Sequence, residues 1–139
     1  MNTNLQINIF MNTKFLLAAL AVFVFVFVVD SIFYGVLMKD YFSSPCMLPE
    51  PDFVYLIIGQ IIISLSFTYL LTKSNFGGSK IESGAMFGVA VGVMMGLGLN
   101  LIFLATSDGF TMTQALVDGF YRIAVLAGAG ILANYVLNR

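Results

Sequence analysis

The sequence contains no histidine and no tryptophan, and Cys46 is its only cysteine. Protein sites for zinc, haem and non-haem iron usually draw on histidine or on several cysteines, so we expect no metal centre and no redox cofactor of these kinds. One cysteine cannot form a disulfide within the chain, and a cysteine nucleophile usually needs a histidine beside it. Cys46 is therefore interpreted as a loop thiol without a catalytic role.

Charged residues are also scarce, at 9% of the 139 residues, against roughly 25% in an average soluble domain. The six basic and seven acidic side chains form no run and no basic patch, which argues against a nucleic-acid partner. Hydrophobic residues make up 60% of the chain. This balance argues against a soluble globular domain and indicates a membrane protein.

Four apolar stretches are long enough to cross a bilayer, for which a helix needs about 20 residues. They cover residues 15–37, 53–71, 84–105 and 113–137. The first contains VFVFVFV, whose period of two is typical of a strand, but a single strand in lipid would leave its backbone groups unpaired. With short connections between the spans, the sequence predicts an all-α membrane protein, an antiparallel four-helix transmembrane bundle that forms one domain over residues 15–139.

Residues 1–14 are expected to form a mobile N-terminal extension, in which Met11 begins a second copy of Met-Asn-Thr and is an alternative start. The first span is longer than the core of a signal peptide and no cleavage site follows it, so we expect it to be retained. Basic side chains flank one side of the four spans and only Lys39 lies on the other, which predicts that both termini are cytoplasmic. The basic residues on the cytoplasmic side are Lys14, Lys73, Lys80 and Arg139.

Helix-start signals precede three of the spans. SKIE at residues 79–82 and TMTQ at residues 111–114 have the spacing of a capping box. Asp52 follows a proline directly before the second span and can cap its first turn. We therefore expect helices to begin after Asp52, Ser79 and Thr111.

Glycine recurs at every fourth position of the third span, at Gly84, Gly88, Gly92 and Gly96, and the next step of four reaches Asn100. Lipid gives helices no hydrophobic drive to associate, so small residues that let two backbones approach closely are typical of helix contacts in membranes. We expect this glycine face to meet another helix, either in the bundle or in a second copy. Gly128, in the AGAGILA segment of the fourth span, is a further expected packing position.

Polar residues of all four spans reach one depth in the outer half of the membrane when about 1.5 Å of rise is counted per residue. Asp118 and Arg122 are four residues apart on one helix face, where an ion pair is possible, and we expect Arg122 to join Asp30 and Asp118 in one network. An unpaired charge at this depth is costly, so we expect a network that faces the interior of the bundle. Its expected members are Asp30, Tyr34, Gln60, Asn100, Asp118 and Arg122.

Two interpretations of this network stay open. In the first, the polar groups only hold the helices together through interhelical hydrogen bonds. In the second, they form an outward-opening pocket in which Arg122 and the carboxylates hold a small polar solute, an ion or a proton.

The sequence shows no nucleophile with a base at recognisable spacing and no nucleotide-binding motif, so we do not expect an enzyme. The favoured function is that of a structural or accessory subunit, whose partners are membrane lipids and either other membrane subunits or further copies of the chain. The alternative is a minimal carrier or channel that uses the polar network. An enzyme acting on lipid headgroups, which would rest only on carboxylates near the interface, ranks last.

Three segments resemble small four-helix bacterial membrane proteins of a family of unknown function. They are SIFYGVLMKDYF at residues 31–42, GAMFG at residues 84–88 and the long segment at residues 105–132 that contains DGFYRIAVLAGAG. The resemblance implies a place in the bacterial inner membrane and no established activity. It also implies five family-type positions, with Phe33 beside them where tryptophan is common: Tyr34, Gly35, Asp118, Gly119 and Tyr121.

Overall fold

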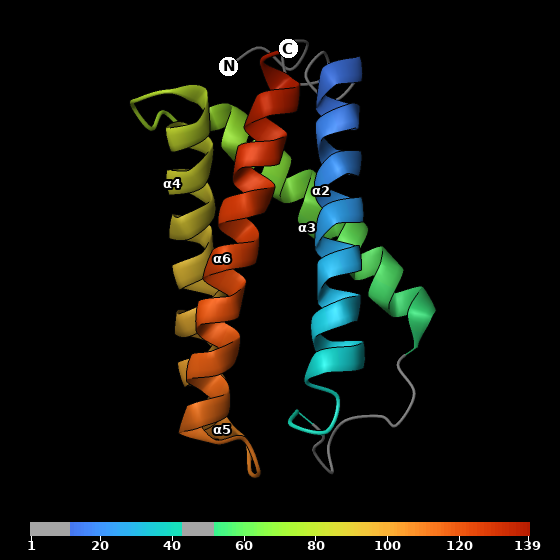
Figure 1. Ribbon diagram of the computed structural model, residues 1–139, viewed down its shortest axis with the longest axis vertical. Coiled ribbons are helices and arrows are strands. Elements are labelled where there is room, and N and C mark those ends of the chain that lie inside the picture. Colours follow the sequence, from blue (N-terminus) through green and yellow to red (C-terminus); the bar gives the residue numbers. More distant parts are fainter. Residues whose placement is uncertain (1–11, 43–51) are drawn as a thin grey trace.

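The computed structural model describes residues 12–42 and 52–139, in which every regular element is helical (Figure 1). Cys46 and residues 1–11 of the expected extension lie outside the described residues. The elements are α2 (Thr13–Ile32), the π-helical η1 (Phe33–Leu37), α3 (Phe53–Lys73), α4 (Lys80–Gly92), the π-helical η2 (Val93–Gly98), α5 (Leu99–Thr106) and α6 (Met112–Leu137).

These elements join into four apolar helices that are long enough to cross a membrane: Thr13–Leu37, Phe53–Lys73, Lys80–Thr106 and Met112–Leu137. They have 25, 21, 27 and 26 residues, which at about 1.5 Å per residue gives lengths of roughly 32 to 40 Å. The all-helical, four-helix part of the prediction is confirmed. One expected boundary was wrong, because Thr13 and Lys14 belong to α2 rather than to a mobile extension. The third helix begins at Lys80, four residues before its apolar stretch.

The expected helix starts are confirmed. The Ser79 hydroxyl accepts from the backbone N–H of Glu82 at 3.3 Å, and the Glu82 carboxylate accepts from the backbone N–H of Ser79 at 2.8 Å. Thr111 and Gln114 form the same reciprocal pair before α6. Asp52 accepts from the backbone N–H of Val54 and caps α3. Each cap satisfies N–H groups that the first turn of a helix leaves without partners.

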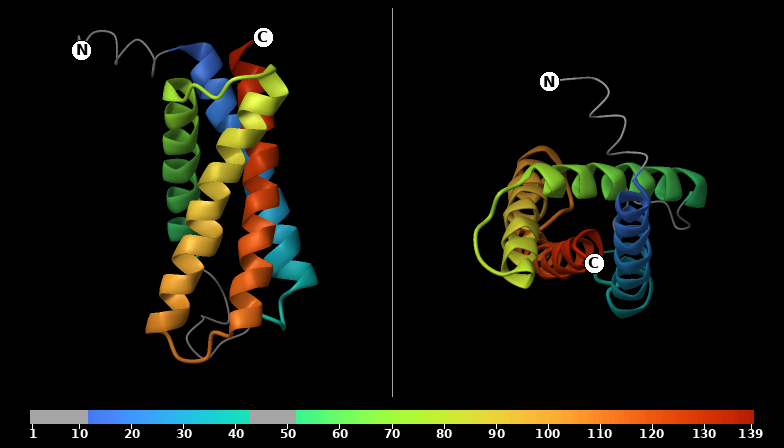
Figure 2. Two further views of the ribbon diagram at one scale, coloured as in Figure 1. Left: turned by 90° about the vertical axis from the view of Figure 1, so that its left-hand side faces the viewer. Right: turned by 90° about the horizontal axis from the view of Figure 1, so that it is seen from above.

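Helix α6 is the central helix of the described structure, since it lies between α4 on one side and α2 on the other (Figures 1 and 2). Helix α3 crosses obliquely and packs mainly on α2. All four spans contribute to the buried apolar core, and the rings of Phe67 on α3 and Phe87 on α4 pack edge to face with centroids 4.9 Å apart. The core residues are Val22, Val26, Phe67, Leu71, Phe87, Val125, Leu126, Ala129 and Ala133.

The four glycines of the third span face the backbone of α6. A Cβ atom at Gly92 would lie 2.6 Å from the Cα atom of Ile123, closer than any side chain could be accommodated without moving the helices apart. As residue numbers rise along α4 and η2, the residue numbers of the facing positions on α6 fall. The third span and α6 therefore run antiparallel. The facing pairs are Gly84 with Gly130, Gly88 with Leu126, Gly92 with Ile123, and Gly96 with Gly119.

Gly128 faces a different helix from the glycines of the third span. A Cβ atom there would lie 3.0 Å from the ring tip of Phe25 on α2. Small residues of α6 thus contact both neighbouring helices, since Gly130 faces α4 and Gly128 faces α2.

Two π-helical segments, which the sequence did not predict, interrupt the spans. In η1 the backbone N–H of Met38 donates to the carbonyl of Phe33, five residues earlier, at 2.8 Å. In η2 the wider turn covers residues 93–98 and includes Gly96. Short π-helical segments are rare and often occur at functional sites. Here η1 follows Asp30 and contains Tyr34, and η2 precedes Asn100, so both border polar residues of the expected network.

Candidate functional site

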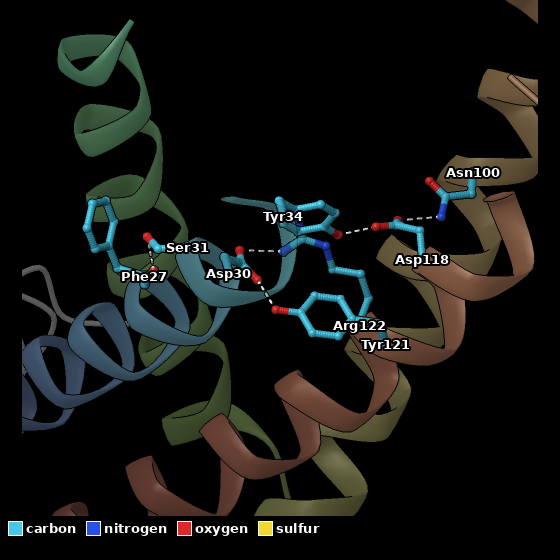
Figure 3. Close-up of polar contacts among 8 residues, drawn as sticks. All are labelled: Phe27, Asp30, Ser31, Tyr34, Asn100, Asp118, Tyr121 and Arg122. Atoms are coloured by element: carbon cyan, nitrogen blue, oxygen red, sulfur yellow. Dashed lines mark hydrogen bonds and ion pairs between the residues drawn. The ribbon is translucent and has the colours of Figure 1, made fainter. Parts of the chain in front are cut away.

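Polar side chains from three spans meet near the end of the molecule that is opposite the start of α2 and the end of α6 (Figures 1 and 3). Helix α6 contributes three of them, α2 and η1 contribute one each, and α5 contributes one. We call this set the polar cluster: Asp30, Tyr34, Asn100, Asp118, Tyr121 and Arg122.

Arg122 reaches across from α6 to α2. Its Nη1 atom lies 2.9 Å from Oδ2 of Asp30. The Arg122 side chain is 31% exposed and the Asp30 side chain 18% exposed. The Tyr121 hydroxyl donates to the other carboxylate oxygen of Asp30 at 2.8 Å. Both oxygens of Asp30 are therefore bound by neighbouring residues of α6, which joins the first span to the last.

Asp118 does not pair with Arg122, although both belong to the expected network. Among the described residues the guanidinium pairs with Asp30 alone, which was also expected in that network. Asp118 instead accepts hydrogen bonds from the Tyr34 hydroxyl and from Nδ2 of Asn100, the latter at 2.6 Å. Figure 3 shows the arrangement: the Arg122 side chain extends toward Asp30 on α2, whereas the Asp118 carboxylate lies between Tyr34 and Asn100.

Asn100 adds a second bond to α6, since its Nδ2 atom also donates to the backbone carbonyl of Ala115 at 3.2 Å. Asn100, four residues after Gly96, thus continues the contact of the third span with α6. At Asn100 the contact consists of hydrogen bonds, whereas at Gly96 the two backbones approach closely.

Aromatic rings surround the guanidinium and the carboxylates. The rings of Phe33 and Tyr121 stack with centroids 3.6 Å apart. The Arg122 guanidinium carbon lies 5.3 Å from the centroid of the Tyr34 ring and 6.0 Å from that of Tyr121, both within cation–π range. The two tyrosines that donate to the carboxylates thus also lie against the guanidinium.

Gln60 does not join the polar cluster. It lies on α3, is 9% exposed, and its Nε2 atom has no hydrogen-bond partner in the described structure. The same holds for the hydroxyl of Thr68, two turns away, whereas Ser64 between them donates to the carbonyl of Gln60 at 2.7 Å. Counting residues gave the depth of Gln60 in its helix, but neither the oblique path of α3 nor the direction of the side chain.

Tyr121 is the member of the polar cluster that spacing and depth did not identify. The resemblance named it as a family-type position, without a role. A signal was present, because Asp118, Tyr121 and Arg122 are spaced by three and four residues and therefore share one face of α6.

The polar cluster offers hydrogen-bond donors, two carboxylates and one guanidinium, and no ligand set of the kind that holds a metal. Throughout residues 12–42 and 52–139, no three side chains of histidine, cysteine, aspartate or glutamate gather in one place. Comparison of the chain with known protein families, with curated proteins and with solved structures finds no match in any of the three.

Proposed function

We propose that the chain is a small multi-pass membrane protein with a structural or accessory role, which associates with other membrane helices and catalyses no reaction. The observation that carries this proposal is the closed bonding of the polar cluster. Asp30 is bound by Arg122 and Tyr121, and Asp118 by Tyr34 and Asn100. Within a membrane such bonds hold helices together, so this cluster has a sufficient role without a ligand.

The proposal includes the arrangement in the membrane. All four spans are antiparallel to their neighbours in sequence, both termini face the cytoplasm, and the membrane is the bacterial inner membrane. The short connections support the alternation of the spans. The excess of basic side chains at the end that carries the termini supports the orientation. The resemblance to small four-helix bacterial membrane proteins supports the choice of membrane.

Helix α3 is the span to which we assign the contact with a partner, an apolar membrane helix of another subunit. The glycines of α4 already face α6 within the chain, so they offer no surface at Gly84 or Gly88. In contrast, Gln60, Ser64 and Thr68 make no hydrogen bond to another helix in the described structure. Helix α3 is therefore held by apolar packing, and a partner on its outer face would fix its position.

Affinity purification from native membranes in mild detergent is expected to recover a second membrane protein at close to one copy per chain. Ile62→Trp, on the outer face of α3, should lower that yield several-fold, because Ile62 is 59% exposed and a larger ring there would prevent close helix packing. Leu101→Trp, at a 48% exposed position of α5, is the matched control and should leave the yield unchanged. Recovery of the chain only as a monomer or as a homo-oligomer would refute the proposal.

A minimal carrier or channel is the second candidate, and the two π-helical segments favour it. Both border the polar cluster, and such segments are frequent at functional sites. The Arg122 side chain is also 31% exposed, and among the described residues it uses one of its five N–H donors in a bond to protein. A small polar solute or a proton would then be held between Arg122 and Asp118.

Proteoliposomes that contain a pH-sensitive dye can test this second candidate with protons as the probe. Arg122→Ala and Asp118→Asn are each expected to lower the proton flux at least about ten-fold if the polar cluster lines the path, as intramembrane charges do in proton relays. Asp108→Asn, a carboxylate in the loop before α6, is the control and should keep the flux. Flux that both cluster variants retain would remove the polar cluster from any transport mechanism, and no flux in the unaltered protein would remove proton transport itself.

A further inference from the structure

The two ends of the molecule carry opposite charge. The end at which α2 begins and α6 ends carries four basic side chains and the carboxylate of Glu82 (Figure 1). The described residues of the opposite end carry Lys39 and three carboxylates, which are Asp40, Asp52 and Asp108. The basic side chains are Lys14, Lys73, Lys80 and Arg139. This basic end of the molecule therefore attracts the anionic headgroups of the lipid leaflet in which it lies.

Lys73 differs from the other two lysines at this end. The ammonium group of Lys14 donates to the carbonyl of Arg139 at 2.5 Å, and that of Lys80 donates to the carbonyl of Asn138 at 2.8 Å. Both lysines thus bind at the C-terminus of α6, where cations are favoured by the helix dipole. In the described structure Lys73 donates no such bond, and its ammonium lies 5.8 Å from the centroid of the Tyr69 ring.

A shallow hollow of about 300 Å³ lies on α3 next to Lys73. It is lined by Leu65, Ser66, Tyr69 and Leu70, within the two turns that precede Lys73. Leu70 is 51% exposed. The hollow thus combines an apolar surface of leucines with hydroxyl groups, and a cation lies one turn beyond it toward the end of the helix. This order matches a phospholipid, whose chain lies deeper in the membrane than its phosphate.

We infer that the C-terminal end of α3 is a binding site for an anionic phospholipid. Its phosphate would lie at Lys73 and Tyr69, and an acyl chain would lie along Leu65 and Leu70. Charge complementarity assigns the occupant, because this end of the molecule has an excess of positive charge and a zwitterionic lipid would gain less from it. The three N–H donors of the Lys73 ammonium are suited to phosphate oxygens. The site is separate from the polar cluster. It lies on the face of α3 that carries Ile62, beyond that residue toward the end of the helix.

Native mass spectrometry of the detergent-solubilised full chain tests the site, with phosphatidylglycerol and phosphatidylcholine as probes. We expect phosphatidylglycerol to bind at lower concentration than phosphatidylcholine. Lys73→Gln should raise the half-saturating concentration of phosphatidylglycerol about five-fold, which corresponds to the loss of one basic residue near a membrane surface. Lys73→Arg should restore binding, and Lys39→Gln at the opposite end is the matched control that should not change it.

The hollow is tested separately from the charge. Leu70→Trp fills the hollow and leaves Lys73 in place, so it should also weaken phosphatidylglycerol binding, whereas Leu101→Trp on α5 should not. Inorganic phosphate at the same concentration should not compete, because it lacks the acyl chain. Equal binding of the two lipids, full binding by Lys73→Gln, full binding by Leu70→Trp or effective competition by phosphate would each overturn the inference.

Discussion

Replacing Gly88 with leucine is expected to separate α4 from α6 and to prevent assembly of the bundle. A Cβ atom at this position would lie 2.5 Å from the carbonyl carbon of Leu126 and 2.6 Å from the Cα atom of Ala127. These are backbone atoms, which no change of rotamer can move. The loss of stability should therefore exceed the roughly 1–3 kcal/mol that extra methylene groups cost in a packed core. Circular dichroism during heating in detergent micelles would show early unfolding or no cooperative transition.

Gly59 on α3 provides the matched control for this substitution. A Cβ atom at Gly59 would meet nothing within 4 Å. Gly59→Ala should unfold at the same temperature as the unaltered protein or higher, because alanine stabilises a helix by about 0.5–1 kcal/mol relative to glycine. Gly92→Leu should behave as Gly88→Leu does, since it faces the backbone of Ile123. An unchanged melting curve for Gly88→Leu would contradict the close approach of α4 and α6.

Replacing Arg122 with methionine is expected to lower the free energy of unfolding by about 3 kcal/mol, since it leaves Asp30 without its cation. This is the lower end of the range for broken buried ion pairs, because Arg122 keeps 31% of its exposure. Asp30→Leu should have a loss of similar size, since it leaves the guanidinium without a carboxylate. Unfolding by a denaturing detergent in mixed micelles measures both losses.

The double variant, with Asp30→Leu and Arg122→Met together, distinguishes an ion pair from two independent contributions. Removing both charges leaves no unpaired charge in the membrane, so most of the loss should be recovered, apart from the bond of Tyr121 to Asp30. Asp108→Asn, in the loop before α6, should change stability little. Losses of the two single variants that simply add would show that Asp30 and Arg122 do not stabilise one another.

The sequence allowed the helices and their starts to be predicted because the signals for both are local. A run of about 20 apolar residues is sufficient to predict a spanning helix. The Ser79 and Thr111 capping boxes depend on residues only three positions apart. The third helix nevertheless began four residues before its apolar run, because the capping box sets the start of a helix and hydrophobicity sets only the part that can lie in lipid.

The partners within the polar cluster were harder to predict because they depend on how whole helices are placed. Spacing showed that Asp118 and Arg122 share a face of α6, but the closer partner of Arg122 lies on α2, across the bundle. Gln60 was assigned to the network by depth alone. Because α3 crosses the other helices obliquely, the Gln60 side chain makes no hydrogen bond to the polar cluster. Helix direction and rotation about the helix axis result from packing between spans, which no single span encodes.

The two π-helical segments had no sequence signal that we could recognise. Hydrogen bonds in a π-helical segment join residues five positions apart instead of four. Amino-acid composition does not show where the extra residue is inserted. Tyr34 lies within η1 and Asn100 follows η2, and both donate to Asp118. Depth along the spans placed both residues in the expected network, so the unpredicted π-helical turns did not affect which residues were expected there.

The bond between Asp30 and Arg122 sets an order of events during biosynthesis. The two residues are 92 positions apart, and α3, α4 and α5 are made between them. At roughly 5–20 residues per second, the carboxylate of the first span waits about 5 to 18 seconds for the guanidinium of the last. Until then the carboxylate of Asp30 lacks the cation with which it pairs in the folded chain. Emergence of α6 from the ribosome is thus the first point at which the charge on α2 can be neutralised by its partner.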